Sequence, residues 1–223
     1  MNLKPIAHIR TAFPEKFGTP RQAGLVPSTG FIEFEEEFRC EEAVRGLGGF
    51  SHIWLIWGFS ENEGSWHPTV RPPRLGGNER LGVFATRSPF RPNALGLSSV
   101  RLLEIRKGPV LVVEAPDMVS GTPVYDIKPY VPYSDCHPEA KEGFTGDDRH
   151  FTRLSVTASE NIREALGSDF PVLSAVLAED PRPAYHKDPD RVYHMKFKAW
   201  EVSFKVCGKE VLVTEAFHPN TAG

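Results

Sequence analysis

Two arginines stand on a proline-rich segment near the middle of the chain, ATRSPFRPNALGLS, residues 85–98. Arg87 and Arg91 each carry a planar guanidinium group, which binds carboxylates or phosphates through paired hydrogen bonds. Pro89 and Pro92 stiffen the backbone beside them, so the side chains lose little freedom when a ligand binds. The segment therefore predicts a binding site for a polar, anionic molecule.

Three further segments combine proline or glycine with charged or polar side chains. They are residues 20–22 (PRQ), 71–78 (RPPRLGGN) and 120–130 (SGTPVYDIKPY). Glycine in such a segment lets a ligand approach the backbone closely. A single segment of this kind is most often structural, but four of them in one strand-rich region favour one shared rim for a ligand.

The elements that must position these segments are expected to be strands. Apolar alternation or short apolar runs predict strands over residues 26–34, 50–59, 80–86, 96–105 and 110–114. The prolines within residues 122–131 are typical of an edge strand, because proline cannot donate to a sheet ladder. Residues 40–47 are typical of a short helix that ends at two glycines.

The second half of the chain has a different pattern. Residues 134–152 lose apolar periodicity and gain charge, glycine and proline, so we expect one domain over residues 1–141 and another over 150–223. Short helices are predicted after Ser159 and from about Phe170. Alternating strands follow from Tyr193, with a bulge expected between Ala199 and Trp200. The predicted fold class is mainly β, with a small α+β C-terminal domain.

Composition narrows the classes of protein. The chain has 223 residues, a net charge of −3 and three widely spaced cysteines, Cys40, Cys136 and Cys207. That spacing predicts neither a disulfide framework nor a structural zinc site. The first ten residues lack the apolar core of a signal peptide, and the apolar run of residues 53–59 is too short to span a bilayer. We expect a cytoplasmic protein that holds no metal and does not enter a membrane.

Several common catalytic motifs are missing from the sequence. The glycines at residues 46–49 precede a predicted strand, whereas a dinucleotide-binding turn follows one and opens a helix. There is no P-loop lysine, no GxSxG and no HExxH. His52 and His67 have no third ligand at usable spacing. A Rossmann enzyme and a metal-dependent hydrolase are therefore disfavoured.

The local charge differs from the net charge. Residues 71–107 contain eight arginines and lysines but only two glutamates, Glu79 and Glu104. A mildly acidic protein with such a basic stretch can bind an anionic partner.

The proline-rich segments also resemble a known family. PRQ (20–22), RPPRLGGNERLGVFATRSPFRPNALGLS (71–98), DMVSGTPVYDIKPY (117–130) and DPRPAY (180–185) closely resemble the TrmO family of RNA methyltransferases. The resemblance implies an S-adenosylmethionine-dependent enzyme whose N-terminal domain is an antiparallel β-barrel-type fold, not a Rossmann fold. It further implies a homodimer that methylates N6 of threonylcarbamoyladenosine, beside the anticodon of threonine tRNAs.

The resemblance also implies a cofactor site. Carried over by position, that site comprises Pro20, Arg21, Gln22, Ser60, Glu61, Arg87, Leu97, Gly121, Thr122 and Pro123. Two positions depart from the family pattern, which often has proline where Ala94 stands and aspartate where Ser120 stands. Arg21 or Arg87 can neutralise the carboxylate of S-adenosylmethionine.

Two charged residues near the cofactor segments are candidates for catalysis. The acceptor nitrogen is a weak nucleophile, so removal of its proton would help the reaction. We expect Asp126 to act as the base and Lys128 to stabilise the anion. The alternative is that Asp126 and Lys128 form a structural ion pair.

A tRNA substrate requires contacts of its own. We expect Arg71, Arg74, Arg91 and Arg101 to contact phosphates, and Asn93, Arg182 and Tyr185 to contact the modified base or its neighbours. For Tyr185 the alternative is ordinary packing of a loop aromatic. The alternative for the whole protein is a non-catalytic barrel that binds RNA or a nucleotide through its arginines. The negative net charge favours a small-molecule site over a pure RNA binder.

Overall fold

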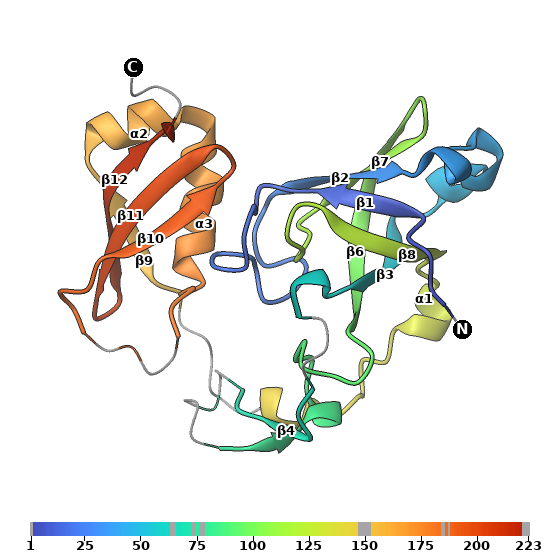
Figure 1. Ribbon diagram of the computed structural model, residues 1–223, viewed down its shortest axis with the longest axis horizontal. Coiled ribbons are helices and arrows are strands. Elements are labelled where there is room, and N and C mark those ends of the chain that lie inside the picture. The colour runs from blue at the N-terminus through green and yellow to red at the C-terminus, as the bar shows by residue number, and fades with distance from the viewer. Residues whose placement is uncertain are drawn as a thin grey trace.

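The computed structural model describes residues 2–62, 66–72, 75, 79–146, 153–183, 186 and 188–219. Two β units, a closed barrel and a four-stranded sheet, make up most of the fold (Figure 1). A small hairpin of β4 (Thr69–Val70) and β5 (Leu81–Gly82) extends from the barrel. The fold is mainly β, as the sequence predicts.

The barrel closes in the order β1-β2-β7-β6-β3-β8, and each neighbouring pair is antiparallel. Its strands are β1 (Ala7–Arg10), β2 (Thr29–Phe34), β3 (His52–Gly58), β6 (Leu95–Arg106), β7 (Val110–Glu114) and β8 (Thr122–Pro129). Ile9, Ile32, Leu55 and Leu111 are fully buried inside it. Closure pairs every strand on both sides, so no edge of this sheet is left open.

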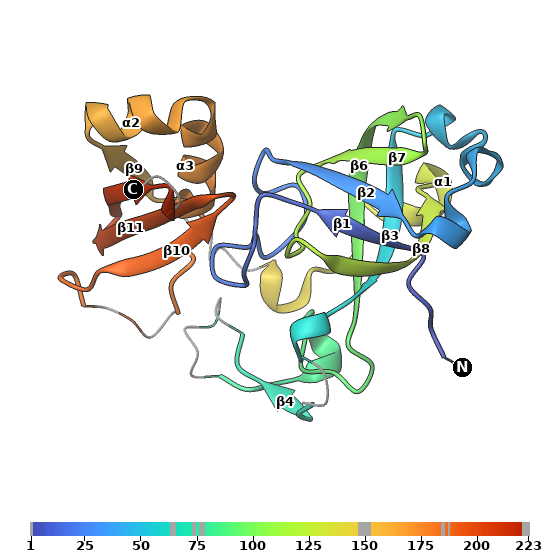
Figure 2. The ribbon, with the colours of Figure 1, turned by 45° about the horizontal axis from the view of Figure 1, so that its top comes forward.

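The C-terminal sheet has the order β10-β11-β12-β9, with β9 parallel to β12. Its strands are β9 (Ser155–Ala158), β10 (Tyr193–Phe197), β11 (Trp200–Cys207) and β12 (Glu210–Phe217). Helices α2 (Glu160–Leu166) and α3 (Phe170–Ala178) lie on one face of it (Figure 2). Ser159 precedes α2 and Gly167 follows it, as the sequence predicts.

A loop of the barrel completes the core of the C-terminal sheet. Residues 11–28 connect β1 to β2, and Phe13 and Val26 of this loop are buried among residues of α3 and the sheet. The ring of Phe17 stacks on that of Phe204, with centroids 6.2 Å apart. The backbone N–H of Lys198 donates to the carbonyl of Ala12 at 2.8 Å. The two units therefore share apolar packing, and the domain boundary stays a prediction.

Some elements differ from the sequence prediction. Residues 40–47 form short 3-10 turns, Glu41–Val44 and Leu47–Gly49, instead of one helix. The expected strand over 80–86 is only Leu81–Gly82, followed by the 3-10 turn Val83–Ala85. The expected edge strand is wrong, because β8 pairs with both β1 and β3.

The bulge expected between Ala199 and Trp200 is also misplaced. Residues 198–199 form the turn of the β10–β11 hairpin, and Lys198 takes a positive φ of 52° there. The register irregularity lies further along β11, between Ser203 and Phe204. The apolar side chains move from odd to even positions between Ala199 and Trp200 because the chain turns there from β10 into β11.

Within the described ranges, no helix combines the length and the apolar character needed to cross a membrane.

Candidate functional site

Most of the predicted cofactor segments lie at one end of the barrel, which we call the loop end. The β1–β2 loop (residues 11–28) and the β7–β8 loop (residues 115–121) are both there, because antiparallel neighbours exchange ends. Gly58, which ends β3, pairs with Leu95, which begins β6, at the same end. Segments far apart in the sequence are thereby brought together.

Backbone hydrogen bonds join the two long loops of the loop end. The N–H of Gly24 donates to the carbonyl of Ala115 at 2.9 Å, and the N–H of Ser120 donates to the carbonyl of Phe13 at 2.7 Å. Gly121 has a φ of +88°, in the left-handed region that favours glycine. The turn that carries Gly121, Thr122 and Pro123 is thus fixed against the loop that carries residues 20–22.

The side chains of Gln22 and Arg87 contact each other directly. Nη1 of Arg87 donates to Oε1 of Gln22, although the two residues are 65 positions apart in the sequence. Nε2 of Gln22 donates to the carbonyl of Arg21 at 2.6 Å. Arg87 is exposed and Gln22 is half-buried. A guanidinium group and an amide predicted separately from the sequence therefore form one polar cluster that solvent can reach.

A carboxylate that the sequence analysis did not single out lies beside this cluster. Asp117 accepts a hydrogen bond from Oγ of Ser98 at 2.7 Å, and Nε1 of Trp57 donates to that same oxygen at 3.0 Å. Burial raises the pKa of Asp117, while hydrogen bonds from Ser98 and from backbone N–H groups, with the charge of Arg87, oppose the rise. Asp117 is the first residue of the motif DMVSGTPVYDIKPY (117–130), which is the sequence signal that could have found it.

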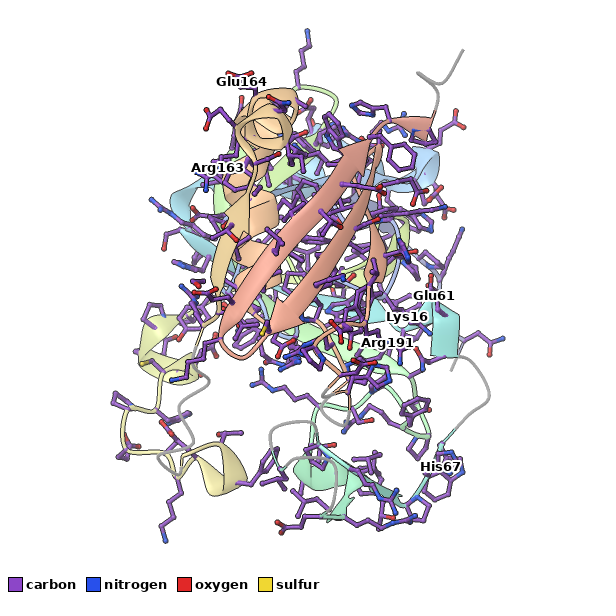
Figure 3. The ribbon with its side chains drawn as sticks, turned by 90° about the vertical axis from the view of Figure 1, so that its left-hand side faces the viewer. Lys16, Glu61, His67, Arg163, Glu164 and Arg191 are labelled. Carbon is purple, nitrogen blue, oxygen red and sulfur yellow. The ribbon has the colours of Figure 1, made fainter. Side chains whose placement is uncertain are left out.

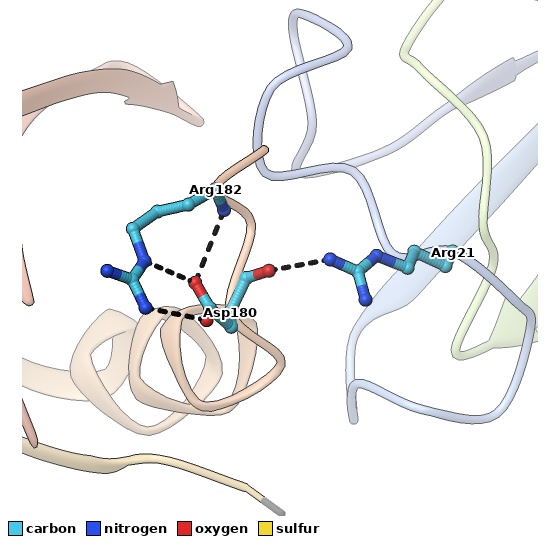
Figure 4. Close-up of polar contacts among 3 residues, drawn as sticks. All are labelled: Arg21, Asp180 and Arg182. Carbon is cyan, nitrogen blue, oxygen red and sulfur yellow. Dashed lines mark hydrogen bonds and ion pairs between the residues drawn. The ribbon is translucent and has the colours of Figure 1, made fainter. Parts of the chain in front are cut away.

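Arg21 reaches from the loop end to the C-terminal unit (Figure 4). Its Nη2 donates to the carbonyl of Asp180 at 2.7 Å. The carboxylate of Asp180 is itself held by Arg182, at 2.7 Å from Nε and 2.8 Å from Nη2. The hydrogen bonds to Asp180 raise the pKa of Arg182, whose side chain is only 14% exposed. Arg182 is thus paired within the protein instead of pointing freely to a substrate.

Ser60 and Glu61 lie in a 3-10 turn, Ser60–Asn62, directly after β3. Nζ of Lys16 donates to the backbone carbonyl of Glu61 at 2.8 Å and lies 3.5 Å from its Oε2 (Figure 3). This ties the turn to the loop of residues 11–28. Ser60 and Glu61 therefore border the same end of the barrel as residues 20–22.

Leu97 and Asp126 lie instead on the outer face of the barrel. Leu97 is 57% exposed, whereas its neighbours Gly96 and Ser98 are buried. Leu97 pairs with Ile56, which pairs with Asp126 on the next strand. Two strand spacings put their Cα atoms about 10 Å apart. Leu97 and Asp126 are therefore close to one another on the outer face of the barrel.

Asp126 and Lys128 form the ion pair that the sequence analysis considered as an alternative. Nζ of Lys128 is 2.9 Å from Oδ2 of Asp126, and the side chains are 60% and 45% exposed respectively. Exposed pairs of this kind contribute little to stability. The ion pair is therefore compatible with either a structural or a catalytic role.

The predicted tRNA contacts are more scattered. Arg71 and Asn93 are exposed. Arg91 folds back on its own loop, where Nη1 donates to the carbonyls of Thr86 at 2.9 Å and Ser88 at 3.3 Å. Nη1 of Arg101 lies 3.5 Å from Glu114. Arg74 and Tyr185 lie outside the described residues.

The expectation of one rim for all four proline-rich segments is only partly right. The segments at 20–22, 86–93 and 120–123 meet at the loop end, as the contacts above establish. Arg71, the first residue of the fourth segment, follows β4, which lies away from the barrel in both views (Figures 1 and 2). Thr69 pairs with Gly82, so Arg71 stands on a hairpin arm. The N–H of His67 on this arm donates to the carbonyl of Phe90 at 3.3 Å, so the arm contacts the 86–93 segment.

Two hollows lie elsewhere on the molecule. One, of about 570 Å³, is at the opposite end of the barrel and is lined by apolar residues such as Phe34, Phe38 and Phe50, with Asp126 at its border. The other, of about 660 Å³, is lined by Lys4, His8 and neighbouring glutamates. Across the described parts of the chain, no three histidine, cysteine or acidic residues gather as metal ligands.

The fold and the site together define a class: a closed antiparallel barrel with polar, arginine-bearing loops at one end, joined to a small α+β unit. Comparison with known families gives a match to the tRNA-methyltransferase O N-terminal domain over residues 8–136 and to the TrmO C-terminal domain over residues 152–217. The chain belongs to the TrmO family.

Individual relatives agree with this assignment. An Escherichia coli (strain K12) protein named tRNA (adenine(37)-N6)-methyltransferase is 40% identical over 226 residues, covering 94% of this chain and 96% of that protein. A Pseudomonas aeruginosa protein, provisionally named S-adenosylmethionine-dependent methyltransferase RcsF, is 42% identical over 212 residues, covering 90% of each. A crystal structure of TrmO from P. aeruginosa superposes with a TM-score of 0.80 at 32% identity, over 98% of this chain and 97% of that one.

Proposed function

We propose that this protein is an S-adenosylmethionine-dependent methyltransferase that modifies N6 of the adenosine just 3′ of a tRNA anticodon. We infer that the acceptor is threonylcarbamoyladenosine in threonine tRNAs. The observation that carries the proposal is the contact between Gln22 and Arg87, which joins two predicted cofactor segments into one exposed polar cluster. Relatives that cover 94% and 70% of this chain are named tRNA (adenine(37)-N6)-methyltransferase, which supports the acceptor class.

The groups at the loop end fit an amino-acid ligand with an adenosine. Arg87 can neutralise a carboxylate through charge-assisted hydrogen bonds, and Gln22 can offer its amide to a ribose or an adenine. Gly121 leaves its backbone open to close approach. Leu97 presents exposed apolar surface nearby. S-adenosylmethionine, when bound, supplies a methyl group activated by a positively charged sulfur.

The outer face supplies a candidate for proton removal. As the bond between N6 and the methyl carbon forms and the bond between sulfur and that carbon breaks, the N6 proton must leave. We infer that the carboxylate of Asp126 accepts this proton and that Lys128, 2.9 Å away, stabilises developing negative charge on the substrate. Asp126 is 45% exposed, so a substrate can reach it.

A tRNA and a second subunit are the partners that we propose. Arg71, exposed on the arm beyond β4, is available to phosphates of the anticodon arm. Leu95 and Leu103, exposed on β6, would be covered in a homodimer. We infer that the protein acts in the cytoplasm, where it meets tRNA.

Calorimetric titration with S-adenosylmethionine tests the proposed function. We expect saturable binding at one site per chain and, with tRNA added, transfer of the methyl group. A barrel that only binds RNA would show no heat of binding with S-adenosylmethionine, and that result would reject the enzyme.

A further inference from the structure

The hairpin arm built on β4 and β5 exposes several aromatic rings. Phe84 is 76% exposed and Trp66 is 52% exposed. His67 is exposed as well, and so is Phe90, which the arm contacts. Single apolar residues are common on protein surfaces, but a group of them marks an interaction site. Since β4 lies away from the barrel (Figures 1 and 2), a partner can reach these rings.

Two backbone hydrogen bonds and a ring contact hold the aromatic residues near one another. The ring centroids of His67 and Phe90 are 6.1 Å apart, and the N–H of His67 donates to the carbonyl of Phe90 at 3.3 Å. The N–H of Val83 donates to the carbonyl of Pro68 at 3.0 Å, and Phe84 is the next residue after Val83. Phe84 and Phe90 are thereby both held beside the start of β4.

Two exposed arginines stand on the same hairpin. Arg71 follows β4 and Arg80 precedes β5. Because Val70 pairs with Leu81, the two arginines lie across from each other where the ladder ends. Nη1 of Arg80 donates to Oγ1 of Thr69 at 3.2 Å, and neither arginine forms an ion pair with a residue that the structure describes. Like charges that face each other on paired strands repel, so an anionic partner would stabilise this hairpin.

We propose that the hairpin arm binds unpaired nucleotides of the tRNA, with bases stacked on its aromatic rings and phosphates held by Arg71 and Arg80. The inference rests on the proposed function and adds to it a surface and a mode of binding. Proteins that bind single-stranded RNA combine positive charge with aromatic rings, because every base has a flat face on which a ring can stack. A base that enters the loop end must leave its own stack, and rings that stack on its neighbours offset that cost.

The charge and the order of the side chains favour RNA over a membrane or a second protein. Residues 66–93 contain five arginines and one glutamate, although the whole chain has a net charge of −3. A polyanion is the partner that such a segment attracts. A membrane-surface element is a helix with one continuous apolar face, whereas here rings and arginines alternate along a hairpin. Single-stranded RNA presents negative charge and flat apolar faces in the same molecule.

The test removes two rings and keeps apolar side chains in their place. We expect the double variant Trp66→Leu/Phe84→Leu to raise the Kd for tRNA about tenfold or more at fixed salt, because base–aromatic stacking is lost. The Kd for S-adenosylmethionine should stay within about twofold of wild type. The conservative double variant Trp66→Phe/Phe84→Trp keeps both rings and should keep the wild-type tRNA affinity within about threefold. Unchanged tRNA affinity in the leucine variant would overturn the proposal.

Salt dependence separates stacking from charge. The slope of log K for tRNA against log salt should be unchanged in the leucine double variant, and it should fall by about 0.7–0.9 in Arg80→Ala. A slope that falls in the leucine variant would mean that the rings only support the arginines. A wild-type slope in Arg80→Ala would mean that the arm holds no phosphate. Either result would overturn the proposal.

Phe50→Leu is the matched control. Phe50 is also an exposed phenylalanine, but it lines the hollow at the opposite end of the barrel. We expect this variant to bind tRNA as the wild type does. An equal loss of affinity in Phe50→Leu and in the leucine double variant would show that RNA binds exposed rings at no particular place, and the proposal would fail.

The same variants reveal another partner of the arm. Suppose that the leucine double variant no longer binds phosphatidylglycerol vesicles, or changes from dimer to monomer in gel filtration, while its tRNA affinity is that of the wild type. The arm would then be a membrane or subunit contact, and the proposal would be overturned. A wild type that binds no S-adenosylmethionine would instead reject the proposed function. That result is distinct, because tRNA affinity is measured without the donor.

Discussion

At the scale of the residue, Arg87 is the group through which the loop end should bind an anion. It is exposed, it stands on a proline-stiffened loop, and Gln22 orients it. Its planar fork can exchange the contact with Gln22 for a carboxylate of the ligand without leaving the site. The Arg87 guanidinium is therefore accessible to a ligand and already oriented by Gln22 before the ligand binds.

We expect Arg87→Ala to weaken S-adenosylmethionine binding by about 10- to 100-fold, since a hydrogen bond to a charged group contributes about 1.5–3 kcal/mol. Calorimetry measures this change. Arg45→Ala is the control, because Arg45 is exposed near the opposite end of the barrel and pairs with Glu42, three residues away. Equal affinities of wild type and Arg87→Ala would remove Arg87 from the site.

Asp126 allows a test that separates binding from chemistry. If Asp126 accepts the N6 proton, Asp126→Asn should lower kcat by about 100-fold or more and leave the Kd for S-adenosylmethionine unchanged. Glu37→Gln, which removes the partner of Lys4 in another exposed ion pair, should leave kcat unchanged. A wild-type turnover number in Asp126→Asn would mean that the pair with Lys128 is only structural.

The assignment of single residues to the cofactor site came from the family resemblance and stays a prediction. The structure brings two of those residues, Gln22 and Arg87, into direct contact. Asp117 was missed because its hydrogen-bond donor, Ser98, lies 19 residues away on β6. No local sequence pattern reveals a partner that the pairing of strands brings close.

At the scale of the element, the β1–β2 loop is the part on which the site depends most. Residues 11–28 carry the 20–22 segment, bond to the β7–β8 loop and bury Phe13 and Val26 against the C-terminal sheet. The C-terminal unit therefore holds in place the loop that carries the predicted cofactor residues 20–22. Arg21 adds a polar link to the same unit, through the carbonyl of Asp180.

Gly18 tests this dependence. Its φ is +89°, and a Cβ there would lie 2.3 Å from Cε of Met195 on β10. We expect Gly18→Ala to cost about 1–2 kcal/mol of backbone strain and about 1–3 kcal/mol of overpacking, and to weaken S-adenosylmethionine binding by displacing the loop. Urea unfolding and calorimetry measure the two effects.

Gly46→Ala is the matched control for that variant. Gly46 has a similar φ of +86°, but nothing lies within 4 Å of a Cβ there, and it borders the opposite end of the barrel. It should lose only the strain of about 1–2 kcal/mol and keep its donor affinity. If both variants bind S-adenosylmethionine equally well, the packing of residues 11–28 does not govern the site.

Strand prediction was accurate where the apolar pattern was local and short. The strand over residues 110–114 matches β7 residue for residue. The strand over 122–131 was predicted, but at a sheet edge, because its prolines lack a backbone N–H for a ladder hydrogen bond. The sequence does not show that the sheet closes into a barrel, which pairs this strand on both sides. The hairpin turn at residues 198–199 was predicted as a bulge, since both features move the alternating apolar positions by one residue along the chain.

At the scale of the whole molecule, the site and the basic arm lie on different parts of the chain. The loop end holds the polar cluster, whereas β4 leads to the arm that carries Arg71 (Figure 2). An anticodon arm could therefore contact the basic arm through its phosphates while one base reaches the barrel. Donor binding and tRNA binding should then respond to different variants.

Salt dependence tests this separation. We expect the double variant Arg71→Ala/Arg74→Ala to reduce the slope of log K for tRNA against log salt by about 1.5, at roughly 0.7–0.9 for each lost phosphate contact. Donor affinity should not change. Arg163→Ala, on α2 at the other extremity (Figure 3), is the control and should leave the slope unchanged. A wild-type slope in the double variant would place the tRNA elsewhere.

The central claim is that a closed barrel, with Gln22 and Arg87 gathered at its loop end, transfers a methyl group to N6 of a tRNA adenosine. The most direct measurement incubates the protein with total tRNA and S-adenosylmethionine that carries a deuterated methyl group, followed by mass spectrometry of the digested nucleosides. The account predicts the label on N6 of threonylcarbamoyladenosine, and loss of the label when Arg87→Ala is assayed at limiting donor concentration. Label on another nucleoside, or on none, would contradict it.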